Sequence, residues 1–287
     1  MPKRSRIVTK ANGLARRASE RIKTNERIHK ELPELPKKIR VKPGVKYINL
    51  TRTTPNQPPS VKPLADAIAK KYHAFLRSAP KNRVFVVAIG GAEGTAKTFL
   101  ASEIQRLFWG KIEIRTLAMD DYYKLSRRER KRKVQELKQT GRMNREDLMI
   151  FEISNNPVLS DFQLLLQHIE ALKQGRAIQK HFYDHSDGEI ICNRETVQPP
   201  RQGILLVEGV YALREELKRA VDLAVFVFAE EEKKYQRVSK RDATERAHGI
   251  YMSNKYFFEA QLTSYRRYIE PTIRNADIIV NTTRLFD

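Results

Sequence analysis

Short apolar runs alternate with segments of helical periodicity through most of the chain. The runs predict five strands, at 83–90, 111–120, 203–209, 222–229 and 276–281. Between the strands, the sequence predicts helices at 95–108 and 161–175 and a charged helix at 230–247. Strands separated by helices predict an α/β fold, with a parallel five-stranded sheet covered by helices on both faces.

The N-terminal part of the chain has a different pattern. Residues 1–60 lack a clear core pattern, although 10–31 has the composition of a charged helix, and 51–60 is rich in proline and polar residues as linkers are. Apolar positions then recur at helical spacing over 62–77. We therefore predict a basic, flexible extension over 1–60 and a single domain over 61–287.

Positive charge is concentrated in two segments of this chain of 287 residues and net charge +21. Residues 1–60 contain 16 Lys and Arg against four Glu. Such an arm attracts polyanions, either nucleic acid or an acidic membrane surface; a solvated tail is the simpler alternative. Residues 124–145 contain ten Lys and Arg against two Glu. This segment is expected either to hold a phosphorylated or polyanionic ligand or to form an ordinary solvated helix.

The cysteine content and the hydropathy pattern limit the cellular compartments in which this protein is expected. A single cysteine, Cys192, leaves no disulfide framework and no zinc site built from thiolates. The sequence contains no apolar run of roughly 18–20 residues, and its basic N-terminus is not followed by the apolar stretch of a secretory signal. We expect a cytoplasmic protein without a membrane span, and the pattern leaves its oligomeric state open.

A glycine-rich turn between the first core strand and its helix has the pattern of a phosphate-binding loop. The motif is GAEGTAKT, formed by Gly91, Ala92, Glu93, Gly94, Thr95, Ala96, Lys97 and Thr98, and it is followed by Phe99. Backbone N–H groups of such a loop surround phosphates, and the helix N-terminus adds a favourable field. Lys97 is predicted to neutralise the β- and γ-phosphates, and Thr98 to offer its hydroxyl to Mg²⁺.

The loop departs from the usual pattern at one position. Ala96 stands where a glycine normally precedes the lysine, and its methyl group could forbid the backbone conformation that the loop needs. The alternative is a glycine-rich turn that binds no nucleotide.

Carboxylates follow two of the predicted strands. The second strand ends in MDDYYK (119–124), and the third ends in Glu208. A carboxylate at this edge can accept the proton of an attacking hydroxyl, and another can hold Mg²⁺ directly or through water. A turn or capping role is the alternative for each.

Basic residues of the helix over 230–247 are candidates for stabilising charge on a transferred phosphoryl group. They are Arg237, Lys240, Arg241 and Arg246. For most of them an ordinary solvated helix face is the simpler reading, and Arg241 and Arg246 are the two that we single out.

Taken in order, these motifs resemble the phosphoribulokinase/uridine kinase family of P-loop kinases over about residues 83–283. Further segments carry the resemblance: SNNPVLSDFQLL (154–165), HFYDH (181–185), SKRDATERAHG (239–249) and YIEPTIRNADIIVN (268–281). The resemblance implies an ATP-dependent kinase that uses Mg²⁺ and phosphorylates a hydroxyl of a small metabolite. It implies the following roles: Asp120 as catalytic base, Tyr123, Asn155, Tyr183 and His185 as substrate contacts, Glu208 as a metal-linked carboxylate, and Arg241 and Arg246 in a lid helix at about 230–249.

The acceptor stays open at this point. A nucleoside such as uridine or cytidine is our first expectation, and a sugar phosphate is the alternative, because the YDHSDG run (183–188) resembles phosphoribulokinases more closely. A second class of function is a degenerate kinase core that binds nucleic acid through the basic arm, with affinity that falls steeply as salt rises.

Overall fold

The computed structural model describes residues 41–52, 59–78, 83–153, 155–245 and 257–287. The charged helix expected over 10–31 lies outside these residues. The described part belongs to one compact unit, Val41–Asp287.

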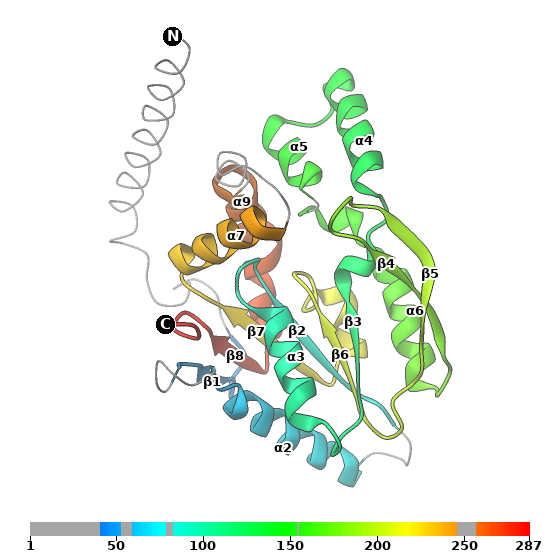
Figure 1. Ribbon diagram of the computed structural model, residues 1–287, viewed down its shortest axis with the longest axis vertical. Helices are drawn as coiled ribbons and strands as arrows, with labels where there is room; N and C mark the ends of the chain where they lie inside the picture. Colours follow the sequence, from blue (N-terminus) through cyan, green and yellow to red (C-terminus); the bar gives the residue numbers. More distant parts are fainter. Residues whose placement is uncertain (1–40, 53–58, 79–82, 154, 246–256) are drawn as a thin grey trace, which may run out of the picture. The chain divides into compact units, whose positions relative to one another are not determined.

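Eight strands form two sheets in this unit (Figure 1). The strands are β1 (Lys46–Asn49), β2 (Phe85–Gly91), β3 (Ile114–Ala118), β4 (Ile178–Tyr183), β5 (Ile190–Val197), β6 (Ile204–Glu208), β7 (Leu223–Phe228) and β8 (Ile278–Asn281). Six of them form a parallel sheet in the order β1-β8-β7-β2-β6-β3, and β4 and β5 form a separate antiparallel pair.

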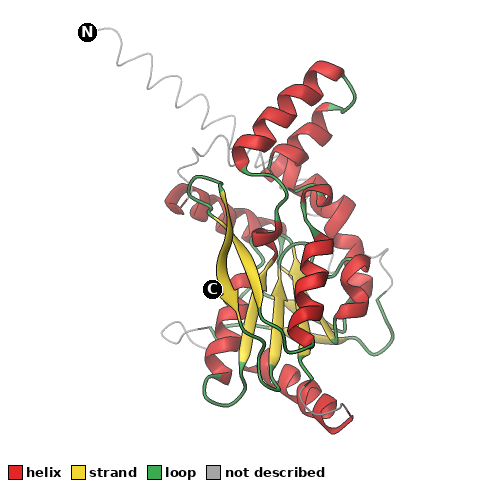
Figure 2. Ribbon diagram, turned by 90° about the vertical axis from the view of Figure 1, so that its right-hand side faces the viewer, coloured by secondary structure: helices red, strands yellow, loops and turns green. Residues whose placement is uncertain are grey.

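Helices cover both faces of the parallel sheet (Figure 2). The longer helices are α2 (Lys62–Ser78), α3 (Lys97–Phe108), α4 (Arg127–Thr140), α5 (Arg145–Glu152), α6 (Phe162–Lys173) and α7 (Glu231–Glu245). Shorter helical segments are η1 (Met119–Tyr122), η2 (Pro157–Leu159), η3 (Glu215–Ala220), η4 (Phe257–Gln261), α9 (Leu262–Ser264), η5 (Tyr265–Ile269) and η6 (Glu270–Asn275). No helix in the described ranges is long and apolar enough to cross a bilayer.

The predicted α/β architecture with a parallel sheet is confirmed, but the sheet has six strands rather than five. The additional strand, β1, pairs in parallel with β8 at one edge of the sheet. It lies within the stretch assigned to the extension, so the predicted boundary at residue 60 is too late. Only Ile48 of its four residues is buried. An edge strand this short gives no periodic signal, because a single apolar position cannot define a period.

The burial of the central strands explains why the parallel sheet could be predicted from the sequence. Every residue of β2 and of β6 is buried. Parallel strands covered on both faces consist of continuous apolar residues, and such runs stand out in a sequence. Parallel pairing also brings their carboxyl ends to one edge, where Glu208 lies opposite Ile89 of β2 and Ala118 of β3.

Helices α4 and α5 pack against each other at the top of Figure 1, away from the parallel sheet. Ser126 and Glu129 form a capping box at the start of α4, and Gly141 ends the helix with φ of 63°. Val134 is buried between the two helices with Leu148. The basic segment 124–145 is therefore mostly helical, and the cap fixes which of its side chains face the body of the domain.

Candidate active site

A cavity of about 650 Å³ lies at the carboxyl-terminal edge of the parallel sheet. Ligands of open α/β sheets bind at this edge, and the volume falls within the usual range for small-molecule sites. Most of the predicted site residues line it: Glu93, Gly94, Ala96, Lys97, Thr98, Phe99, Asp120, Tyr123, Asn155, Tyr183, His185, Glu208 and Arg241. Gly91, Ala92 and Thr95 belong to the same loop but not to the cavity wall, and Arg246 lies outside the described residues.

The loop between β2 and α3 is tightly packed against neighbouring backbone. A Cβ atom on Gly91 would lie 2.1 Å from the carbonyl oxygen of Val227, and one on Gly94 would lie 2.6 Å from that of Lys234. Gly94 also has φ of 73°, in the left-handed region. Gly91 also has a positive φ, of 146°, so both positions require glycine for space and for conformation.

Ala96 adopts the conformation that its methyl group was expected to disfavour. Its φ and ψ are 68° and 28°, so the residue is left-handed at the N-cap of α3. Its side chain packs against the main apolar core. No side chain caps this helix start, which leaves its N-terminal N–H groups facing the loop. The alanine thus takes the left-handed conformation at the end of the loop, at the cost of local strain.

We expect Ala96→Gly to raise the free energy of unfolding by about 0.5–1 kcal/mol, because glycine removes the strain of a left-handed alanine. Chemical denaturation of the two proteins measures this difference. An Ala101→Gly control, at a buried position in the interior of α3, should instead destabilise the protein. A less stable Ala96→Gly protein would contradict the strained geometry at this position.

Lys97 is buried at the start of α3 and points back into its own loop. Its Nζ donates to the carbonyl oxygen of Ala92 at 2.8 Å, and the hydroxyl of Thr95 donates to the same oxygen at 2.7 Å. Burial lowers the pKa of Lys97, and the nearby carboxylates of Glu208, Glu93 and Asp120 oppose that shift. A desolvated ammonium of this kind is suited to bind phosphate oxygens, because their negative charge stabilises its protonated form.

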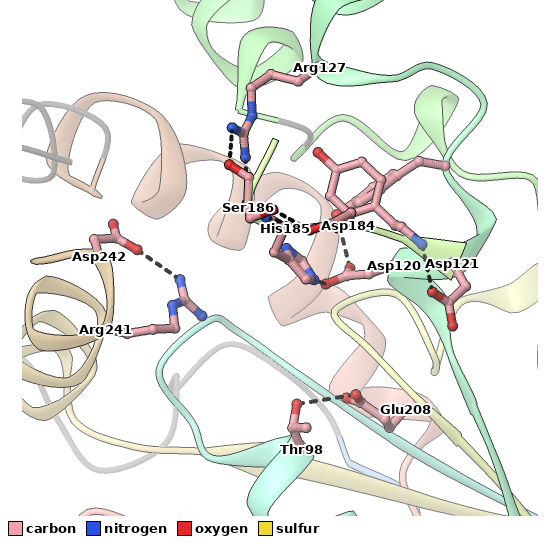
Figure 3. Close-up of polar contacts among 12 residues, drawn as sticks. Thr98, Asp120, Asp121, Arg127, Asp184, His185, Ser186, Glu208, Arg241 and Asp242 are labelled. Carbon is pink, nitrogen blue, oxygen red and sulfur yellow. Dashed lines mark hydrogen bonds and ion pairs between the residues drawn. The ribbon is translucent and has the colours of Figure 1, made fainter. Parts of the chain in front are cut away.

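Thr98 and Glu208 lie side by side in the cavity wall, where their side-chain oxygens could serve as metal ligands (Figure 3). The Thr98 hydroxyl donates to Glu208 Oε1 at 3.1 Å. Burial raises the pKa of Glu208, whereas the charge of Lys97 opposes this. The described residues contain no cluster of three or more His, Cys, Asp or Glu suited to a metal. The pair nevertheless fits Mg²⁺, which usually takes one or two carboxylates and completes its shell with phosphate oxygens and water.

Asp120 lies in η1, just after β3, and its carboxylate is held by two side chains. The Tyr123 hydroxyl donates to Oδ1 at 3.0 Å, and His185 Nε2 lies 3.3 Å from Oδ2 (Figure 3). Burial and the negative charge of Asp120 raise the pKa of Tyr123 well above its ordinary value, so this hydroxyl remains a donor. The side chain of Asp120 is 41% exposed, which leaves it accessible to a ligand in the cavity.

The neighbouring aspartate has a different environment. Asp121 is buried, and its Oδ2 accepts a hydrogen bond from Lys180 at 2.5 Å. Its other oxygen accepts from the backbone N–H of Tyr183 at 3.0 Å. Asp121 therefore ties η1 to β4, while Asp120 faces the cavity. The structure thus distinguishes two adjacent carboxylates that the strand pattern alone left equivalent.

Helix α7 forms another wall of the cavity. Arg241 lines the cavity, and its Nη2 lies 3.4 Å from Oδ1 of Asp242 (Figure 3). Arg237 is mainly an anchor, because its guanidinium donates to the carbonyl oxygens of Gly94 and Thr282 at 3.1 and 2.7 Å. These bonds hold the middle of α7 against the loop between β2 and α3.

Several cavity residues were not singled out from the sequence. Phe286 contacts Phe99 edge to face at 5.1 Å, and the guanidinium of Arg237 lies 4.9 Å from its ring centre. Arg127, Arg130 and Lys131 of α4 also line the cavity. These three residues share one helix face at positions i, i+3 and i+4, a spacing that could have flagged them within the basic segment.

The fold and this loop define a P-loop α/β protein, and comparison with known sequences specifies the family. The sequence profile of the phosphoribulokinase/uridine kinase family matches residues 86–287. A phosphoribulokinase of Synechocystis is 28% identical over 72% of this chain and 56% of its own length. A uridine kinase of Brevibacillus brevis is 26% identical over 68% of this chain and 83% of its own. The chain thus spans little more than half of the phosphoribulokinase that it matches.

Solved structures show the same fold. D-glycerate 3-kinase from Cryptococcus neoformans superposes with a TM-score of 0.55 at 15% identity, over 77% of this chain and 95% of that one. Phosphoribulokinase from Rhodobacter superposes with a TM-score of 0.51 at 12% identity, over 71% and 74% of the two chains. The chain belongs to the phosphoribulokinase/uridine kinase family, as its motifs predicted. P-loop kinases of this family use ATP with Mg²⁺.

Proposed function

We propose that this protein is an ATP-dependent kinase that transfers the γ-phosphoryl group to a hydroxyl of a small metabolite. One observation carries the proposal: Lys97, the Thr98–Glu208 pair and Asp120 all line a single cavity. Phosphoryl transfer needs a phosphate cradle, a place for Mg²⁺ and a base, and three neighbouring strand ends supply them here. Ala96, which motivated the non-enzymatic alternative, itself takes the left-handed conformation at the start of α3, which supports a loop that still accommodates phosphate.

The loop and α7 would hold the nucleotide. The N-terminal N–H groups of α3 and the Lys97 ammonium bind the β- and γ-phosphates in this arrangement, and Arg241 approaches from α7. Thr98 and Glu208 hold Mg²⁺, which when bound neutralises charge on the phosphate oxygens. Phe99, Phe286 and Arg237 form an aromatic and cationic patch on the same wall, suited to stack on a nucleobase.

Asp120 would act on the acceptor. Its carboxylate accepts the hydroxyl proton as the acceptor oxygen bonds to the γ-phosphorus, and the bond between that phosphorus and the β–γ bridging oxygen breaks to release ADP. Tyr123 and His185 orient the carboxylate by holding one oxygen each. Asn155 and Tyr183 line the same space and are proposed contacts for the acceptor.

A panel of hydroxyl compounds incubated with γ-labelled ATP and Mg²⁺ tests this function. We expect label to move to at least one nucleoside or sugar derivative, and the transfer to depend on Asp120. ATP binding without transfer to any member of a broad panel would contradict the kinase assignment and favour a binding role.

A further inference from the structure

Helix α4 presents three cations to the cavity, and the most buried of them has no carboxylate partner in the part of the chain that the structure describes. Arg130 is only 3% exposed. Its guanidinium donates to the backbone oxygen of Leu125 at 2.9 Å and to the Tyr183 hydroxyl at 3.0 Å, which are both neutral acceptors. Its Nε is buried and has no hydrogen-bond partner among the described residues.

The electrostatic environment of Arg130 is incomplete without a ligand. The rings of Tyr123 and Tyr183 lie 5.6 and 5.8 Å from its guanidinium carbon, which compensates only part of the cost of burying a charge. Glu152 is the carboxylate that α5 contributes to the cavity wall, yet within the described residues it forms no ion pair with Arg130. Buried charges in proteins are normally paired, so a negatively charged ligand is expected here.

Two further cations of α4 line the cavity together with Arg130. Lys131 is exposed and lines the cavity. Arg127 holds the turn after β4 by donating to the backbone oxygens of His185 and Ser186 at 2.8 and 3.3 Å (Figure 3). A guanidinium has five N–H groups, and these two bonds leave others of Arg127 available to a ligand. The three side chains thus concentrate positive charge at one end of the cavity.

This cationic end lies beside the proposed base. Tyr123 donates to Asp120 and packs edge to face on Tyr183 at 5.0 Å, and Tyr183 accepts from Arg130. A pair of packed tyrosines therefore separates the cations from the carboxylate. A small molecule with a hydroxyl at one end and an anionic group at the other fits this spacing.

We propose that the acceptor is an anion whose phosphate or carboxylate group binds Arg130, Lys131 and Arg127 while its hydroxyl faces Asp120. This inference rests on the proposed kinase function and specifies the class of its acceptor. A neutral nucleoside, the first expectation from sequence, would leave Arg130 buried without a counter-charge. An anionic acceptor supplies that charge, and charge-assisted bonds to guanidinium groups are among the strongest polar contacts.

Matched neutral and anionic acceptors test the inference with the full-length protein. The pairs are ribose with ribose 5-phosphate, ribulose with ribulose 5-phosphate, and glycerol with glycerate, and uridine and cytidine are added as neutral nucleosides. We expect the anionic member of at least one pair to be phosphorylated with a kcat/KM roughly 10- to 100-fold above every neutral compound. A preferred phosphate or a preferred carboxylate then identifies the anionic group.

Variants of α4 test the residues. With the preferred acceptor, Arg130→Met should raise the acceptor KM about 10- to 100-fold and Lys131→Met about 3- to 10-fold, without a change in the KM for ATP. Arg132→Met removes the same charge from an exposed position of α4 outside the cavity wall and should change neither value. If Arg130→Met fails to fold, Lys131→Met decides, because its side chain is exposed.

The outcomes separate the two proposals. Neutral nucleosides or sugars phosphorylated as well as their anionic counterparts would overturn the anionic acceptor and leave the kinase function standing. An unchanged acceptor KM in both Arg130→Met and Lys131→Met would do the same. Transfer to no compound, with ATP still bound, would overturn the kinase function and the inference together.

Discussion

Replacing Asp120 with Asn is expected to lower the turnover number for phosphoryl transfer by about 10²- to 10⁴-fold, the usual contribution of a positioned general base. The amide keeps the size of the side chain but cannot accept the hydroxyl proton. ATP binding should change little, because Lys97 and the backbone of the loop remain in place. Steady-state kinetics with the best acceptor, together with an ATP titration, measure the two effects separately.

Asp121→Asn is the matched control, since it makes the same change one residue further along. It should lower the free energy of unfolding, because Lys180 would lose the charge of its buried partner. Asp120 is partly exposed, so its variant should unfold at nearly the wild-type denaturant concentration. Wild-type turnover in Asp120→Asn would remove this residue from the role of base.

The second large effect is expected from Lys97→Met, which should reduce kcat/KM for ATP by about 10²- to 10³-fold. Methionine keeps the unbranched side chain as far as the ε position but removes the ammonium that would face the phosphates. Lys70→Met, at an exposed position on α2, is the control and should leave the kinetics unchanged. Equal values of kcat/KM for Lys97→Met and the wild type would mean that this loop does not bind the γ-phosphate during catalysis.

The sequence predicted the central sheet well because its strands are buried on both faces. The continuous apolar runs of β2, β6 and β7 need no knowledge of their partners to be recognised. The antiparallel pair was missed for the opposite reason. Most residues of β5 are exposed, so its sequence shows no alternation between a buried and an exposed face. Its pairing with β4 is a long-range property, as is the pairing of β1 with β8.

The candidate site was partly predictable for a similar reason. Consecutive residues carry the loop motif, so the sequence alone predicts the loop, and the structure adds that Ala96 takes the left-handed conformation there. The resemblance of the motif singled out Asp120, but the structural role of Asp121 depends on tertiary contacts, because Lys180 is supplied by a strand about sixty residues away. The same holds for Arg130, whose neutral environment is defined by Tyr183 and cannot be read from a basic segment alone.

Isothermal titration of the full-length protein with ATP in the presence of Mg²⁺ tests the central claim most directly. We expect saturable binding of one ATP per chain, weakened by removal of Mg²⁺ and by Lys97→Met, and unaffected by Lys70→Met. Absence of Mg²⁺-dependent ATP binding by the folded wild-type protein would contradict the claim that the turn between β2 and α3 holds a nucleotide.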